Sequence, residues 1–133
     1  MTADTSSQLR LDNLGIAVRD VAAAASFFRE GLGFDVEERD HDAEVNLGSG
    51  TRLYLFETAT AAAHRDRSPE LDDNPAGPDH VSFRVDDVDE ACRRLQGRGI
   101  EFIHGPADKP DWGLRVAPFR DPDHNLYFLI KPL

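Results

Sequence analysis

The sequence contains little that could cross-link the chain or anchor it in a membrane. Cys92 is the only cysteine, so no disulfide can form within the chain. No apolar run approaches the roughly 20 residues that a membrane-spanning helix needs. Residues 1–7 lack the basic and then apolar order of a signal peptide. We therefore expect a cytoplasmic protein that does not contact membranes, with residues 1–8 as a disordered tail.

Positive charge is also scarce. The chain has 15 Lys and Arg residues against 25 Asp and Glu residues, which gives a formal net charge of −10. This charge repels phosphate backbones, so we expect no nucleic acid partner. The hydrophobic fraction of 40% is ordinary for a globular protein. We expect residues 9–133 to form a single domain.

An internal repeat is the most informative feature of the sequence. The segment Asp12–Val21 aligns with Asp79–Val88, and both copies have Asp at their first and ninth positions and Val at their seventh and tenth. After a one-residue slip, Gly31–Val36 aligns with Gly97–Phe102. Because the matches follow the same order in both halves, the repeat predicts that the two halves fold alike.

Each copy has the pattern of a strand, a helix and further strands. Apolar residues alternate along 14–18 and 81–85, as they do in a half-buried strand. Asp20 and Asp87 are typical N-caps for the helices that follow, and Cys92 falls on the apolar side of the second helix. Further strands are predicted at 34–39, 43–48 and 52–57 in the first copy, and at 100–104, 114–119 and 125–131 in the second.

These elements predict an α+β fold of two βαβββ modules that form a cupped mixed sheet. Module one covers residues 9–58 and module two covers residues 79–132. The connecting loop, residues 59–78, is rich in Ala, Asp and Pro, and it could also cover a pocket.

Strand alternation predicts that one face of each sheet packs on its helix and leaves the other face free. The predicted free face combines aromatic rings with polar groups, which suits a concave pocket for a small molecule. An ordinary half-hydrated sheet that packs on a partner is the alternative. The predicted face consists of Asn13, Gly15, Glu44, Asn46, Arg52, Tyr54 and Phe56 in module one, and of His80, Ser82, Arg84, Arg115, Phe119, Phe128 and Ile130 in module two.

Four segments carry a resemblance to a known family. Leu11–Asp20 looks like its opening strand, and Phe27–Phe34 like its helix end with an aromatic pair before Leu-Gly-Phe. Asp121–Asn125 looks like its Asp-Pro-Asp-Gly-Asn turn, with His124 at the Gly position, and Trp112-Gly113 is similar to a Trp-Gly pair of its antibiotic-binding branch. The chain thus resembles the glyoxalase/bleomycin-resistance/dioxygenase group of the vicinal oxygen chelate superfamily.

The resemblance implies two βαβββ modules that curl into cups, in a homodimer with two pockets. It also implies where a divalent metal would bind in the metal-dependent members, and those positions are Asn13, Tyr54, His80 and Phe128 here. Only His80 is a good ligand type, and Phe128 has no donor atom. We therefore expect no metal and no other cofactor.

Several side chains would contact a ligand. Trp112 can stack on a flat ligand or cover a cation, while Tyr54, Phe56, Phe119 and Phe128 would form apolar walls. Arg84 and Arg115 favour an acidic ligand, whereas Glu44 favours a basic one, and the sequence does not decide between them. The predicted ligand-binding residues are Asn13, Glu44, Tyr54, Phe56, His80, Arg84, Trp112, Arg115 and Phe128.

Three hypotheses follow for the function. The first is a metal-independent binding protein for an antibiotic or a similar natural product, with His80 as a polar contact. The second is an enzyme, either a metal-dependent lyase, isomerase or dioxygenase, or a metal-free catalyst with His80 as the general base. The third is a dimerising module without a pocket.

Overall fold

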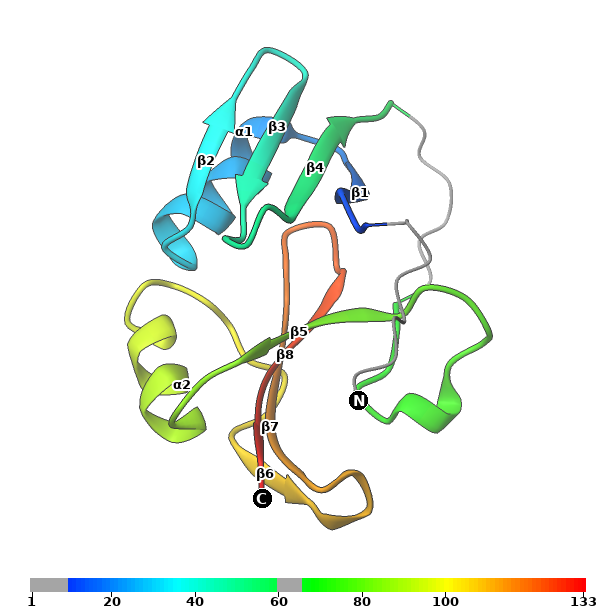
Figure 1. The fold of residues 1–133 in the computed structure, drawn as a ribbon, viewed down its shortest axis with the longest axis vertical. Helices are drawn as coiled ribbons and strands as arrows, with labels where there is room; N and C mark the ends of the chain where they lie inside the picture. The colour runs from blue at the N-terminus through cyan, green and yellow to red at the C-terminus, as the bar shows by residue number, and fades with distance from the viewer. Residues whose placement is uncertain (1–9, 60–65) are drawn as a thin grey trace, which may run out of the picture.

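A computed structural model describes residues 10–59 and 66–133 (Figure 1). The expected tail, residues 1–8, and residues 60–65 of the expected connecting loop lie outside these ranges. Within them, no helix is long and apolar enough to cross a membrane.

Module one begins with strand β1 (Asn13–Val18) and helix α1 (Val21–Ser26), which continues into a π-helical turn, η1 (Phe27–Gly31). Strands β2 (Asp35–Glu38), β3 (Asp42–Asn46) and β4 (Arg52–Glu57) follow. The sheet has the order β1-β4-β3-β2, and β1 runs parallel to β4 while the other pairs are antiparallel.

Module two repeats this arrangement. Its elements are β5 (His80–Arg84), α2 (Val88–Gln96), β6 (Ala107–Lys109), β7 (Leu114–Arg120) and β8 (Leu126–Pro132), and the sheet order is β5-β8-β7-β6. Two short 3-10 turns, η2 (Leu71–Asp73) and η3 (Pro110–Trp112), flank the second sheet. The equivalent order of strands confirms the α+β fold of two βαβββ modules, which form two four-stranded sheets.

The strand predicted at residues 100–104 is wrong. In this segment the chain makes a single bridge, from Phe102 to Phe119, and the third strand of the module is β6. The apolar residues Ile100 and Phe102 of this segment pack in the core without taking part in a strand. An apolar pattern reports burial, which an irregular segment can share with a strand.

The two helix N-termini form as predicted. The side chain of Asp20 accepts hydrogen bonds from the backbone N–H groups of Ala22 and Ala23, and Asp87 accepts one from Glu90. In module one, Glu57 also accepts a hydrogen bond from the backbone N–H of Val21, because strand alternation turns it toward the helix.

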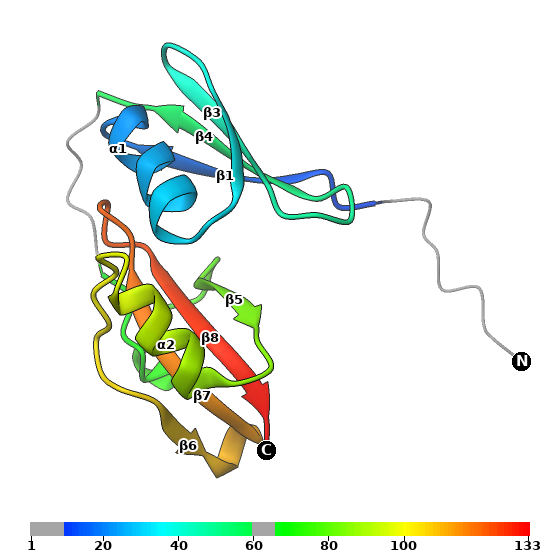
Figure 2. The same cartoon turned by 90° about the vertical axis from the view of Figure 1, so that its left-hand side faces the viewer.

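One hydrophobic core joins the two modules, which are stacked along the long axis of the molecule (Figures 1 and 2). Phe27 and Phe28 of η1 contact Tyr127 of β8 with ring centroids 6.0 Å apart, and Phe34 meets Phe83 of β5 at 5.3 Å. The helix-bearing faces of both sheets therefore pack toward each other, which turns their opposite faces away from the core.

A buried carboxylate organises the turn between β7 and β8. Asp121 is only 8% exposed and accepts hydrogen bonds from the backbone N–H groups of Asp123 and Asn125 and from the Tyr127 hydroxyl, the last at 2.7 Å. Burial and the neighbouring carboxylate raise the pKa of Tyr127 well above its usual value. His124 has φ 69°, the positive value expected at the position of a glycine.

We expect Tyr127→Phe to lower the free energy of unfolding by about 1–3 kcal/mol, because the Asp121 carboxylate would lose a buried donor. Urea denaturation would measure the loss. Tyr54→Phe removes a hydroxyl bond to Asp42 at a half-buried position, whereas Tyr127 is fully buried, so it serves as the matched control and should cost less. Equal losses in the two variants would contradict this account of the turn.

Candidate ligand-binding site

The open face of each module is the sheet face that points away from the shared core. In module one the register places Asn13 beside Arg52, and Tyr54 beside both Gly15 and Glu44, with Phe56 next along β4. These side chains therefore share one face, as the alternation predicts. Whether they contact a ligand stays a prediction.

Charged side chains dominate the open face of module one. Arg52 donates to Asp12 at 3.0 Å and lies 3.5 Å from Glu44. The Tyr54 hydroxyl donates to Asp42 at 2.8 Å, and this hydrogen bond raises the pKa of Tyr54. The Tyr54 and Phe56 rings stack with centroids 5.8 Å apart. This face offers a flat aromatic surface bordered by carboxylates.

The open face of module two instead contains an apolar slot of about 160 Å³. Phe128 forms its floor, with the Trp112 ring edge-on at 6.2 Å and the His80 ring edge-on at 4.8 Å. Ser82 is the second polar side chain of the lining. The remaining walls are Leu71, Leu114, Val116 and Ile130.

The segment that carries Leu71 is held by an ion pair. Lys109 Nζ lies 3.0 Å from Glu70 Oε1, and it also stands over the Trp112 ring, 5.4 Å from the ring centre. Asn74 closes the same segment through hydrogen bonds with the backbone N–H and carbonyl of Ser68. Part of the predicted connecting loop thus packs on the slot.

Two residues predicted on the open face of module two lie on its opposite face. Phe119 pairs with Tyr127 and is fully buried in the shared core. Arg115 donates hydrogen bonds to Asp89 of α2 at 2.8 Å and to Asp108 at 2.9 Å. Their predicted placement is wrong because β7 is buried on both sides, which hides its alternation. Arg84, in contrast, is exposed on the open face, opposite Ile130.

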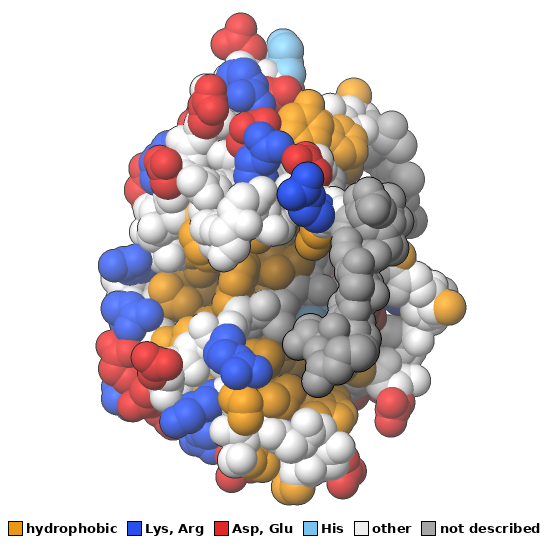
Figure 3. All heavy atoms as spheres, in the orientation of Figure 1, with side chains coloured by type: hydrophobic (Ala, Val, Ile, Leu, Met, Phe, Trp, Pro, Cys, Tyr) orange, Lys and Arg blue, Asp and Glu red, His pale blue; other side chains and the backbone are white. Residues whose placement is uncertain are grey.

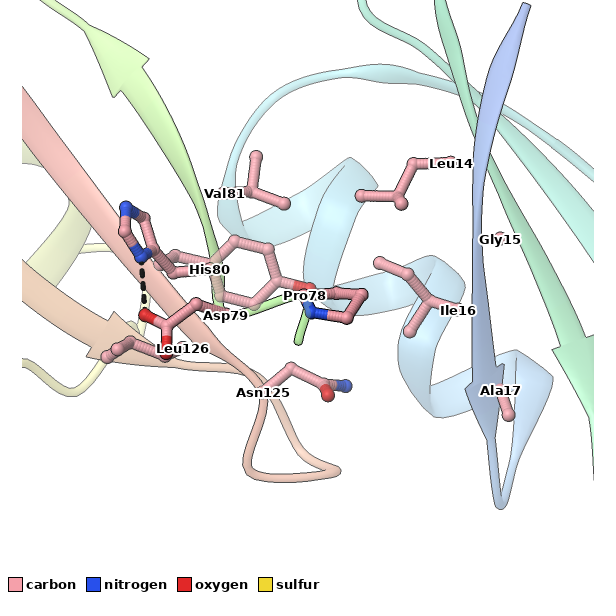
Figure 4. A pocket seen from close by; sticks show the side chains of 11 residues that line it. Leu14, Gly15, Ile16, Ala17, Pro78, Asp79, His80, Val81, Asn125 and Leu126 are labelled. Carbon is pink, nitrogen blue, oxygen red and sulfur yellow. Dashed lines mark hydrogen bonds and ion pairs between the residues drawn. The ribbon is translucent and has the colours of Figure 1, made fainter. Parts of the chain in front are cut away.

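Asp79 is a residue that the sequence analysis did not select. Its Oδ2 lies 2.7 Å from His80 Nδ1, and both side chains are 24% exposed (Figure 4). The internal repeat contains the signal, because the equivalent pair in module one behaves alike. Asn13 donates from Nδ2 to Asp12 at 2.8 Å, and this hydrogen bond is the main cause of the lowered pKa of Asp12.

A second cavity, of about 400 Å³, lies between the modules. Leu14 and Ile16 of β1 line one side, and Pro78 and Val81 line the other (Figure 4). His80 lines both this crevice and the slot, so it stands in the wall between them. The crevice is larger and has Tyr127 in its lining, whereas the slot is lined by Trp112 and Phe128.

The positions that the fold associates with a metal do not offer a suitable donor set. Phe128 has no donor atom, Tyr54 donates its proton to Asp42, and Asn13 carries an amide, a poor ligand for transition metals, so His80 is the one good ligand type among these positions. Among residues 10–59 and 66–133, no group of three or more His, Cys, Asp or Glu side chains is placed to hold an ion. Transition metals need at least three good ligands, which these residues do not supply.

Comparison with known proteins gives a consistent result. Residues 10–127 match the family model described as the Glyoxalase/Bleomycin resistance protein/Dioxygenase superfamily. The uncharacterized protein YraH of Bacillus subtilis (strain 168) is 28% identical over 128 residues, which cover 94% of this chain and all of that protein.

Solved structures agree. TnmS3, an antibiotic binding protein from Streptomyces sp. CB03234, is 29% identical with a TM-score of 0.69, covering 96% of this chain and 99% of that one. A glyoxalase/bleomycin resistance protein/dioxygenase from Nocardioides is 25% identical with a TM-score of 0.71, covering 98% of this chain and 87% of that one.

The contact between Arg115 and Asp89 makes a pH-dependent prediction. Hydrogen bonding to Arg115 lowers the pKa of Asp89 in the folded state. Because the pKa of Asp89 is lower in the folded state, its ionised carboxylate stabilises the fold at pH values above the ordinary aspartate pKa of 3.8. This stabilisation is lost as the pH falls through the folded-state pKa. We expect Arg115→Gln to be less stable than the wild type at pH 7 and this difference to shrink below 3.8. Urea denaturation across this range would test it, and a difference independent of pH would contradict it.

Proposed function

This chain belongs to the Glyoxalase/Bleomycin resistance protein/Dioxygenase superfamily, and we propose that within it the chain binds a small organic molecule without using a metal ion. The slot of module two is the observation that carries the proposal. It combines the rings of Trp112 and Phe128 with aliphatic walls, and its lining among the described residues has two polar side chains, which is the usual make-up of a site for an organic ligand.

The donor chemistry supports binding without a metal. A metal-dependent lyase, isomerase or dioxygenase needs at least three converging ligands, and the matched positions supply a single imidazole, that of His80. The likeness to TnmS3, an antibiotic binding protein, supports a ligand of the natural-product kind. We place the ligand against Trp112 and Phe128, with His80 and Ser82 as its polar contacts.

We further propose that the chain acts as a homodimer. Among the described residues, strands β1 and β5 each pair with one neighbour, so each has an unpaired edge beside the crevice between the modules. Leu14 is 41% exposed and Phe56 is 39% exposed. Figure 3 shows hydrophobic side chains gathered in a band between the modules. A second copy of the chain would cover such edges and apolar side chains.

Trp112 lines the slot, and because it is the only tryptophan of the chain, the tryptophan fluorescence comes from this site alone. We expect saturable quenching of its fluorescence by one or more members of a panel of aromatic natural products. Ser82→Phe should weaken that binding by about ten-fold or more, since the new ring would fill the slot and displace apolar contacts worth at least about 1.4 kcal/mol. Glu37→Phe places the same ring at an exposed strand position of module one, so it is the matched control and should leave affinity unchanged.

Metal analysis supplies the outcome that would contradict the proposal. The protein is equilibrated with Ni²⁺, Mn²⁺, Zn²⁺ or Fe²⁺, desalted, and analysed for bound metal. We expect no stoichiometric retention. Retention of about one ion per chain, lost in His80→Ala, would instead favour a metal-dependent lyase, isomerase or dioxygenase.

The dimer is tested by light scattering coupled to size-exclusion chromatography. One chain has a mass of 14.8 kDa, and we expect twice this value. Leu14→Asp should shift the protein toward the monomer and keep its circular dichroism spectrum, because this side chain is exposed within one chain. A wild-type protein that stays monomeric at high concentration would contradict the proposal.

A further inference from the structure

We propose that the slot of module two selects a flat aromatic compound that carries a hydroxyl group, and that His80 Nε2 accepts the hydrogen bond from this hydroxyl. The inference rests on the proposed binding function, and it adds the chemical class of the ligand and the atom that recognises it. Asp79 acts as a positioning residue, because it touches His80 and not the ligand.

The contact with Asp79 determines which ring nitrogen is the acceptor. An ionised carboxylate can only accept hydrogen bonds, so His80 Nδ1, at 2.7 Å from Asp79 Oδ2, carries the proton. In a neutral imidazole, Nε2 then has a lone pair and no hydrogen. Asp79 is itself oriented by Arg67, whose Nη1 lies 3.8 Å from Oδ1.

The geometry leaves Nε2 available in the slot. Figure 4 shows the second ring nitrogen on the side of His80 that points away from β1 and the crevice. The ring stands edge-on to Phe128 and lines the slot. No hydrogen bond to Nε2 is found among the residues that the structure describes. A donor on a ring that lies over Phe128 would supply one.

The charges around the slot favour a neutral hydroxyl over an acidic group. Among the described residues that line it, none carries a full charge when His80 is neutral. Arg115 binds Asp89 on the opposite face of the sheet, and Lys109 is paired with Glu70. Arg84 is exposed on the open face opposite Ile130, but it does not line the slot. A carboxylate or phosphate in the slot would therefore lose water without gaining a cation, which is costly. A phenolic hydroxyl needs only the acceptor that His80 offers.

Module one has an equivalent contact between an aspartate and the side chain that follows it. Asn13 occupies the position of His80 in the repeat and donates to Asp12, so its Oδ1 is left as an acceptor on the open face. In both modules, an aspartate thus orients the following side chain and leaves a neutral acceptor on the sheet.

The experiment uses two probes that differ only in the donor, 2-naphthol and 2-methoxynaphthalene. The full-length protein is labelled with ¹⁵N, and the single indole N–H signal of Trp112 is followed in a titration with each probe. We expect 2-naphthol to bind about ten-fold more tightly or better, because the methyl ether leaves the His80 acceptor without a partner. His80→Leu should abolish this preference and still bind the methyl ether.

A control and a spectroscopic readout separate recognition from mere structure. His41 is another histidine beside a carboxylate, 3.4 Å from Glu57, but it is 84% exposed and far from the slot, so His41→Gln should keep the preference. The imidazole ¹⁵N shifts should identify His80 as the Nδ1–H tautomer in the wild type, and Asp79→Ala should shift this population toward Nε2–H.

The outcomes separate the two proposals. Equal affinity for both probes, or a proton on Nε2 of wild-type His80 (as the Nε2–H tautomer or the doubly protonated ring), would overturn the inference and leave the binding function intact. If neither probe, nor any aromatic compound of the panel, moves the Trp112 signal, the proposed binding function fails as well. Both wild-type measurements decide the matter even if His80→Leu does not fold.

Discussion

Each sheet of this protein has one helix to cover it, and the aromatic contacts between the modules complete the cover. Phe27 and Phe28 reach Tyr127 across the boundary, and Phe34 reaches Phe83. This shared core determines which face of each sheet is buried. Because the helix-bearing faces are committed to it, the opposite faces and the free edges of β1 and β5 are the surfaces that remain for a ligand or a partner.

The fold could be predicted from the sequence to the extent that the sequence alternates or repeats. The repeated segments that begin at Asp12 and Asp79 predicted two equivalent modules, and the aspartate N-caps placed both helices. The prediction was wrong where burial masks alternation. Residues Val116–Phe119 are buried on both faces of β7, so their side chains do not reveal which face of the strand is which. The turn at Asp121 sets the register by pairing Arg120 with Leu126, and this register determines the face that Arg115 occupies.

The candidate site was predictable only in part. Strand alternation pointed to Phe128 and the Trp-Gly pair pointed to Trp112, and the two residues lie together in the slot. Tyr54 and Phe56, in contrast, lie on the open face of module one, and Phe119 lies in the core. The pairing of Asp79 with His80 depends on side-chain rotamers at the start of β5, which residue spacing does not specify. The removal of Arg115 from the open face also weakens the acidic-ligand alternative that composition had left equal to a basic one.

The slot has walls of two different kinds. Phe128 and Val116 belong to a hydrogen-bonded sheet, whereas Leu71 belongs to a segment that the ion pair between Lys109 and Glu70 holds against it. Glu70 is 60% exposed, and exposed ion pairs weaken as dissolved ions screen them. Dissolved salt therefore weakens one of the contacts that hold the Leu71 wall, while the sheet hydrogen bonds that hold the floor are shielded from it.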